Sequence, residues 1–233
     1  MNNLHPQIPL SFRPKDTLTF ENFVTGANQD VVEALYSQLT TPDMPLLYLW
    51  GAEGSGCSHL LQAACHRASQ LQRTAIYLPL DELCHFEPAI LEGIDAMELV
   101  CLDHLQAIAG LGDWEEALFH LFNRMLEQQS ALLVAATQPP RGVGLQLADL
   151  QSRLASCAVF KVSGLDDANK VRLLKDRAAD KGLELNDEAA HYILNRSDRS
   201  LEALLKNLDF LDRSSLSAGR RLTIPFIKQA MNW

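Results

Sequence analysis

The feature that most constrains the fold is a glycine-rich loop between an apolar run and a helical pattern. Residues 51–58 read GAEGSGCS, after the run PLLYLW and before the segment HLLQAACHRASQL. Glycines at such a strand-to-helix turn let backbone N–H groups and the first helical turn converge on an anion. The predicted phosphate-binding residues are Gly51, Gly54, Ser55, Gly56, Cys57, Ser58 and His59. A purely structural glycine turn is the alternative.

Cys57 stands where phosphate-binding loops usually carry a lysine that reaches the β and γ phosphates. The absence of this lysine should weaken triphosphate binding and catalysis more than diphosphate binding, because the loop amides can still bind a diphosphate. A thiol at the start of a helix is also expected to ionise near neutral pH, and the thiolate would repel phosphate. We therefore expect ADP, or another nucleotide, as the ligand, with the Ser58 hydroxyl bound to Mg²⁺ or to phosphate.

Short apolar runs alternate with helical patterns through most of the chain. Continuous apolar runs are typical of a parallel sheet covered on both faces, and two intervening segments, 59–71 and 113–129, have apolar residues at helical spacing. These patterns predict a three-layer α/β domain with a P-loop, over residues 17–163. The runs lie at 45–50, 74–80, 97–104, 131–137 and 158–163.

Beyond Ser163 the sequence has helical periodicity without strand signals. Four segments, which start at Asp166, Asn186, Ser200 and Thr223, each begin with a residue that commonly caps helices. Residues 164–233 are therefore predicted to form a small α-helical domain. The first 16 residues contain three prolines and are predicted to form an extended tail.

Composition excludes several classes of function. The formal net charge of −9 argues against strong direct binding to DNA, which depends on Lys and Arg contacts to phosphates. Five cysteines without a C-x-x-C pair are expected to be reduced, which favours a cytoplasmic protein. No apolar stretch approaches the roughly 18 residues of a membrane span, and the N-terminus lacks the features of a signal peptide.

A second candidate element is the run LVCLD, which ends at Asp103. In P-loop NTPases a strand-end aspartate holds Mg²⁺, so Asp103 and Ser58 are the predicted metal ligands. The next residue is His104, where hydrolytic relatives with paired acids have a carboxylate that polarises water. This departure, like Cys57, predicts loss of hydrolysis rather than of binding. The alternative is an aspartate that only caps the following loop.

Several segments resemble the AAA+ ATPase domain of the bacterial replication initiator DnaA, in the same order and over nearly the whole chain from Thr17. TLTFENFVTGANQ resembles the segment that lines the adenine pocket, which implies roles for Phe20, Phe23 and Val24. ATQPP resembles the sensor-one strand, with Thr137 as the sensor. LQSRL resembles the arginine-finger box, and SDRSLEALLKNL the sensor-two helix. The resemblance implies a P-loop AAA+ domain followed by an α-helical lid.

The resemblance also implies roles for two arginines. Arg153 would act as an arginine finger, presented to nucleotide on a neighbouring subunit rather than on its own chain. Arg199 would reach from the lid to the nucleotide. An ordinary salt bridge near Asp149 is the alternative for Arg153.

The chain ends at Trp233, one helix beyond the lid pattern, whereas DnaA has a further DNA-reading domain. The chain thus resembles the ATPase core of DnaA without its DNA reader, and this resemblance implies a DnaA-related regulator that switches the initiator off. Gln7, Leu10 and Phe12 have the Q-x-x-L-x-F spacing of peptides that bind the DNA polymerase sliding clamp. The expected partners are DnaA and the DNA-loaded clamp, and the alternative for the tail is packing across its own domain.

Two other functions remain open from the sequence. One is a motor or helicase loader that hydrolyses its own ATP, and the other is a passive adaptor that occupies the clamp or DnaA without affecting hydrolysis. A homodimer that hides Arg153 until the clamp is engaged is a further hypothesis.

Overall fold

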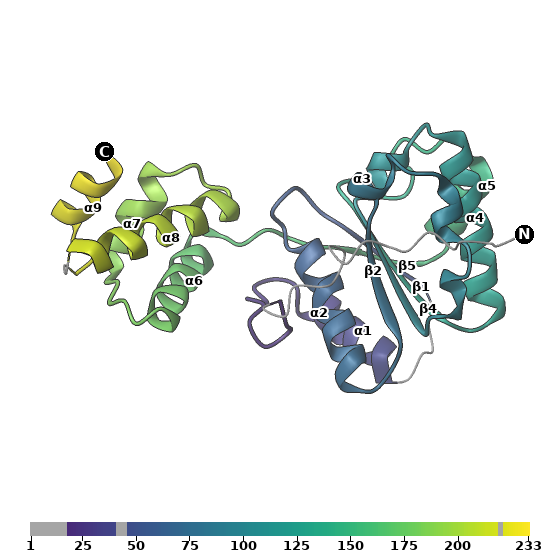
Figure 1. The fold of residues 1–233 in the computed structure, drawn as a ribbon, viewed down its shortest axis with the longest axis horizontal. Coiled ribbons are helices and arrows are strands. Elements are labelled where there is room, and N and C mark those ends of the chain that lie inside the picture. Colours follow the sequence, from purple (N-terminus) through teal and green to yellow (C-terminus); the bar gives the residue numbers. More distant parts are fainter. Residues whose placement is uncertain (1–17, 41–45, 219–220) are drawn as a thin grey trace, which may run out of the picture. The chain divides into compact units, whose positions relative to one another are not determined.

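The apolar runs form five parallel strands in the computed structural model, which describes residues 18–40, 46–218 and 221–233. Their spatial order is β2-β3-β4-β1-β5, and Figure 1 shows the sheet that they form. All six residues of β4 and all five of β3 are buried, as expected of strands covered on both faces. The strands are β1 (Leu46–Trp50), β2 (Ala75–Pro79), β3 (Leu99–Asp103), β4 (Ala131–Ala136) and β5 (Ala158–Lys161).

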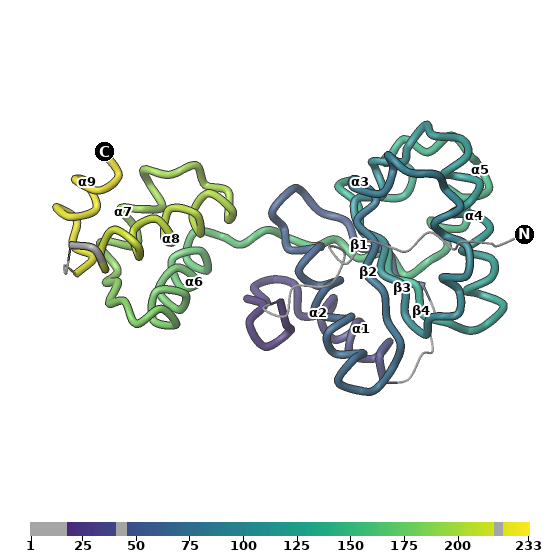
Figure 2. The backbone as a smooth tube through the Cα atoms, in the orientation of Figure 1, coloured from purple at the N-terminus to yellow at the C-terminus, as the bar shows by residue number. Residues whose placement is uncertain are grey.

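Helices cover both faces of the sheet, which confirms the predicted three-layer fold (Figure 2). Successive side chains of a strand point to opposite faces: Leu47 and Leu49 pack with α1 (Gln29–Thr40) and α2 (Cys57–Gln70). Tyr48 packs on the other face, with the cluster that includes residues of α3, α4 and α5. The elements on this face are α3 (Leu80–Leu83), η2 (Pro88–Leu91), η3 (Ile94–Ala96), η4 (Leu105–Ile108), α4 (Gly112–Glu127) and α5 (Ala148–Ala155).

The strand order creates a place for a ligand at the carboxyl ends of β1 and β4. From β1 the chain crosses to β2 at one edge of the sheet, and from β4 it crosses to β5 at the other edge. Trp50 pairs with Ala136, so the two strands end side by side. The loops that follow them diverge, and ligands of open α/β sheets bind at such switch points.

Residues 165–233 form a second compact unit, separate from the first after Gly164. Asp166, Asn186 and Thr223 accept hydrogen bonds from backbone N–H groups and so cap their helices, as predicted. The helices of this unit are α6 (Asp167–Asp180), α7 (Asp187–Arg196), α8 (Leu201–Ala218) and α9 (Ile224–Met231). Within the described ranges, no helix of the chain has both the length and the apolar character required to cross a bilayer.

Candidate functional site

The glycine-rich loop joins β1 to α2, and its backbone is held closely by neighbouring strands. The Gly51 N–H donates to the carbonyl of Ala136 at 3.2 Å, and a Cβ at Gly51 would lie 2.4 Å from the carbonyl oxygen of Val162. Gly54 and Gly56 have φ angles of 74° and 105°, which favour glycine. Since Gly56 has no side chain to cap α2, the first-turn N–H groups of the helix are available to an anion.

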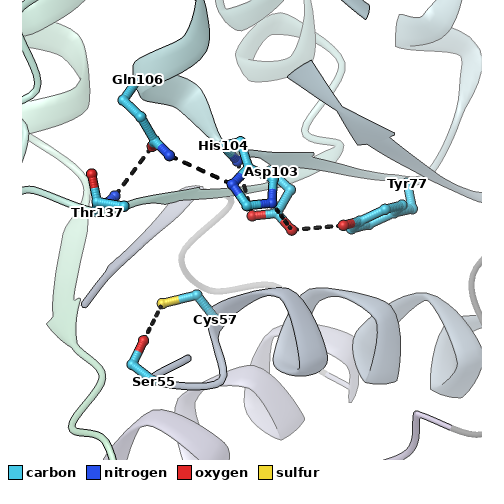
Figure 3. A network of polar contacts seen from close by, with 7 residues as sticks. All are labelled: Ser55, Cys57, Tyr77, Asp103, His104, Gln106 and Thr137. Carbon is cyan, nitrogen blue, oxygen red and sulfur yellow. Dashed lines mark hydrogen bonds and ion pairs between the residues drawn. The ribbon is translucent and has the colours of Figure 1, made fainter. Parts of the chain in front are cut away.

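Cys57, the first residue of α2, is half-buried, and its Sγ lies 3.5 Å from the Oγ of Ser55 (Figure 3). Burial raises the pKa of the Cys57 thiol to about 11, and the charge of Asp103 acts in the same direction. The expected thiolate at neutral pH is therefore wrong, because desolvation outweighs the effect of the helix N-terminus. The loop thus carries neither a lysine charge nor a negative sulfur.

Asp103 ends β3 and is only 2% exposed. Its Oδ2 accepts a hydrogen bond from the Tyr77 hydroxyl at 2.6 Å, and its Oδ1 accepts one from the backbone N–H of His104 at 2.9 Å (Figure 3). Burial, followed by the charge of Asp103, raises the pKa of Tyr77, which keeps this hydroxyl a donor. A carboxylate has about four acceptor sites, so Asp103 retains room for further partners.

The predicted magnesium ligands, Ser58 and Asp103, do not form a complete metal site by themselves. Nowhere in the described part of the chain do three or more His, Cys, Asp or Glu side chains gather in a way that could hold an ion. Mg²⁺ at nucleotide sites is commonly bound through one or two carboxylates together with phosphate oxygens. A magnesium ion held by Ser58 and Asp103 would therefore need phosphate oxygens to complete its coordination.

A polar network runs from Asp103 to Thr137, the predicted sensor (Figure 3). The Nε2 of His104 lies 3.7 Å from the Oδ2 of Asp103, and its Nδ1 lies 3.5 Å from the Nε2 of Gln106. The Oε1 of Gln106 in turn accepts a hydrogen bond from the backbone N–H of Thr137 at 3.2 Å. His104 supplies an imidazole here, and no carboxylate that could polarise an attacking water.

Two of the predicted nucleotide-binding residues meet at the phosphate loop. The Phe23 ring lies against Gly56, where a Cβ would approach it to 2.7 Å, and it also contacts the His59 ring edge-on at a centroid distance of 5.2 Å. The Nε2 of His59 donates to the carbonyl of Thr19 at 2.8 Å. His59 therefore joins the segment before α1 to the phosphate-loop helix through a hydrogen bond.

Phe20 faces α1 instead, where its ring lies 4.6 Å from that of Tyr36, and Val24 is half-buried. The same segment ends at Asn28, which is 2% exposed and which sequence reasoning missed. Its Nδ2 donates to the carbonyl of Ser163 at 2.9 Å, and its Oδ1 accepts from the N–H of Ser163 at 2.7 Å. The segment 19–28 is thus joined to the phosphate loop at one end and to the exit of β5 at the other.

Arg153 lies on α5 and is exposed. Its guanidinium makes no hydrogen bond or ion pair with any residue in the described ranges, and the alternative pairing with Asp149 is absent there. Arg199, in the second unit, forms an ion pair with Asp167 at 3.2 Å, while its side chain remains 61% exposed. Gln7, Leu10 and Phe12 lie outside the described residues.

Sequence reasoning also missed three residues that hold this region in place: Tyr77, Gln106 and Glu115. Only Glu115 had a recognisable signal. It lies at helical spacing with the buried residues Leu118 and Phe122, so a charged side chain falls on the apolar face of α4. An acid in such a position must find hydrogen-bond donors.

Comparisons with known families divide the chain at the same place as the two units. The model of the bacterial DnaA ATPase domain matches residues 15–161, and the model of the Hda lid domain matches residues 167–231. An uncharacterized protein from Haemophilus influenzae is 38% identical over 230 residues, which are 98% of this chain and 100% of that protein.

Solved structures show the same fold at lower identity. Domain III of the replication initiation protein DnaA from Thermotoga maritima has a TM-score of 0.81 at 20% identity, over 92% of this chain and 95% of that one. AMPPCP-bound DnaA from Aquifex aeolicus has a TM-score of 0.73 at 23% identity, over 88% of this chain and 68% of that one. The chain therefore belongs to the family of bacterial DnaA ATPase domains, as a DnaA-related, Hda-like AAA+ protein.

Proposed function

We propose that this chain is a negative regulator of replication initiation, which stimulates hydrolysis of ATP bound to DnaA through Arg153. The observation that carries the proposal is the exposed Arg153 guanidinium, which has no partner within the described ranges. An arginine supplied in trans stabilises the charge that develops on the transferred phosphoryl group. Such a residue must remain unpaired on its own chain in order to reach a neighbour.

The chain's own site suits nucleotide binding better than hydrolysis. The loop amides and the uncapped start of α2 can hold phosphates, whereas Cys57 supplies no cation and His104 supplies no carboxylate. ADP is the proposed ligand, because the loop lacks the lysine that would hold a γ phosphate. A magnesium ion that binds together with the phosphates, beside Ser58 and Asp103, would neutralise part of their negative charge.

An arginine finger is worth about 10³ to 10⁵ in hydrolysis rate, or roughly 4 to 7 kcal/mol of activation barrier. That range is large enough to convert slow intrinsic turnover into a switch. The proposed tether for this activity is the motif of Gln7, Leu10 and Phe12, through which this chain would bind the sliding clamp. Binding to the clamp would restrict stimulation to DNA that carries a loaded clamp.

The test is single-turnover hydrolysis of radiolabelled ATP prebound to DnaA, with DNA-loaded clamp present. The intact chain is compared with Arg153→Ala, with Arg172→Ala as a control on another exposed arginine, and with a chain lacking residues 1–12. Among the described residues, Arg172 forms a single ion pair, with Asp176 on the surface of α6, at 3.8 Å.

We expect acceleration by the intact chain and by Arg172→Ala, and its loss in the other two variants. Acceleration that survives Arg153→Ala would exclude the finger. No acceleration by the intact chain would reject the regulator and favour the passive adaptor.

A further inference from the structure

Glu115 is a buried acid whose carboxylate binds three backbone N–H groups from two separate loops. It lies in the first turn of α4 and is 1% exposed. Its Oε1 accepts from Gly110 at 2.7 Å and from Gln146 at 3.1 Å. Its Oε2 accepts from Gln146 at 2.8 Å and from Leu147 at 2.6 Å. In the described part of the chain Glu115 has no ion-pair partner, so these donors alone compensate its burial.

The bonds to Gln146 and Leu147 fix the start of α5, the helix that carries Arg153. This helix has only eight residues, and Leu147, which precedes it, provides no side-chain cap. Two buried leucines, Leu150 and Leu154, attach one face of α5 to the core. The Glu115 carboxylate takes the place of the missing cap, and its negative charge suits the N-terminal end of a helix.

Arg153 lies six residues beyond Leu147, so any displacement of the start of α5 moves the guanidinium. A misplacement of about 1 Å at a reacting centre can cost about 100-fold in rate. A short helix held by two leucines alone could rotate or fray at its first turn, whereas a carboxylate bound to three backbone N–H groups, two of them at the start of α5, opposes both motions.

We propose that Glu115 is a positioning residue, which holds α5 in the orientation that presents Arg153 to nucleotide on a partner. This role rests on the proposed function of Arg153. The hydrogen bonds by which Glu115 fixes the start of α5 lie within this chain and do not depend on a partner. Glu115 itself contacts no nucleotide in this account and acts only through the backbone of residues 146 and 147.

The test compares Glu115→Gln with Glu116→Gln, which makes the same chemical change at the next residue. Glu116 is 70% exposed at its side chain and pairs only weakly, at 3.7 Å, with His120. Glutamine at position 115 would place an NH₂ group against backbone donors, so at least one of the contacts would be lost. Amide hydrogen exchange in the isolated chain measures the local stability of residues 146–155. Single-turnover hydrolysis of ATP on DnaA measures how far the stimulated rate depends on that stability.

For Glu115→Gln we expect exchange in residues 146–155 to accelerate by about fivefold or more. The maximal stimulated rate should fall about tenfold or more, while the concentration for half-maximal stimulation changes by less than about threefold. ADP affinity should stay within about twofold, and Glu116→Gln should behave as the unaltered chain in every measurement.

Unchanged exchange in Glu115→Gln would overturn the hold on α5, and faster exchange with full stimulation would overturn the positioning role. If the unaltered chain fails to stimulate DnaA, the proposed function falls together with this role, and the exchange data alone then report on α5. Should Glu115→Gln not fold, Leu147→Pro removes one N–H donor at a φ of −75° that proline accepts, and the same results are expected.

Discussion

At the scale of single residues, Cys57 leaves the phosphate loop without the lysine charge that such loops usually carry. Burial raises its pKa to about 11 from an ordinary value of 9.0, so between these values the folded chain binds more protons than the unfolded chain. The contribution of Cys57 to stability is therefore present below about pH 9 and is lost as the pH rises towards 11. At neutral pH the loop contains a neutral thiol.

This pKa predicts a low reactivity of Cys57. At pH 8 the thiolate fraction should be about one in a thousand, and alkylation by iodoacetamide should accelerate about tenfold per pH unit up to about pH 11. Peptide-resolved mass spectrometry separates Cys57 from the other cysteines, and the urea-unfolded chain, whose rate should be half-maximal near the ordinary pKa of 9.0, is the control. A plateau at pH 8 in the folded chain would contradict the assignment.

Tyr77 donates the side-chain hydrogen bond that holds the Oδ2 atom of Asp103. Tyr77→Phe removes a 2.6 Å hydrogen bond to a buried charge, which should lower the free energy of unfolding by about 1.5 to 3 kcal/mol. Urea denaturation measures this change. Tyr36→Phe is the matched control, because the Tyr36 hydroxyl has no hydrogen bond within the described residues, and it should change the free energy of unfolding by less than about 0.5 kcal/mol. Equal effects of the two substitutions would contradict a special role for Tyr77.

At the scale of elements, Asn28 joins the start of α1 to the chain that leaves β5. Asn28→Ala would leave the N–H and carbonyl of Ser163 without their side-chain partners, which should lower the free energy of unfolding by about 2 to 4 kcal/mol. Asn28→Asp keeps only the acceptor and should also destabilise the chain. Gln29→Ala, on the exposed side of the same helix, is the control.

Both Asn28 substitutions are measured by urea denaturation against this control. Stability within about 0.5 kcal/mol of the unaltered chain in Asn28→Ala would show that the junction does not depend on this side chain.

The elements that the sequence predicted well are those with strong periodicity or a local cap. The strands and the helices of the second unit follow from continuous apolar runs and from caps such as Asp166, which act within a few residues. The spatial order of the strands and the contacts of Asn28 and Glu115 join residues far apart in the chain. Such partners have no local signal.

In the candidate site, too, the features formed by contiguous residues could be predicted and those formed by distant residues could not. The phosphate loop could be recognised because its glycines, strand and helix are contiguous in the sequence. The protonation of Cys57 could not, because it depends on burial by the fold. The network from Tyr77 to Thr137 gathers side chains and backbone from separate loops and strands (Figure 3), and no spacing in the sequence predicts it.

At the scale of the whole molecule, the chain combines a DnaA-like ATPase fold with an Hda-like lid and a phosphate loop that lacks its cation. We predict that ADP binds more tightly than ATP in equilibrium titrations, because no side chain of the loop compensates the γ phosphate. Cys57→Lys should tighten ATP binding by about tenfold or more, and Cys57→Ser is the control that adds no charge. ATP binding at least as tight as that of ADP in the unaltered chain would contradict the account.

The central claim is that hydrolysis takes place on the partner and not on this chain. The most direct measurement places γ-labelled ATP on one protein at a time and measures the release of labelled phosphate. In one reaction DnaA carries γ-labelled ATP and this chain carries unlabelled ADP, and in the other this chain carries γ-labelled ATP and DnaA carries unlabelled ADP, with DNA-loaded clamp in both. We predict rapid release of labelled phosphate only in the first reaction. Comparable release in the second, or none in the first, would contradict the account.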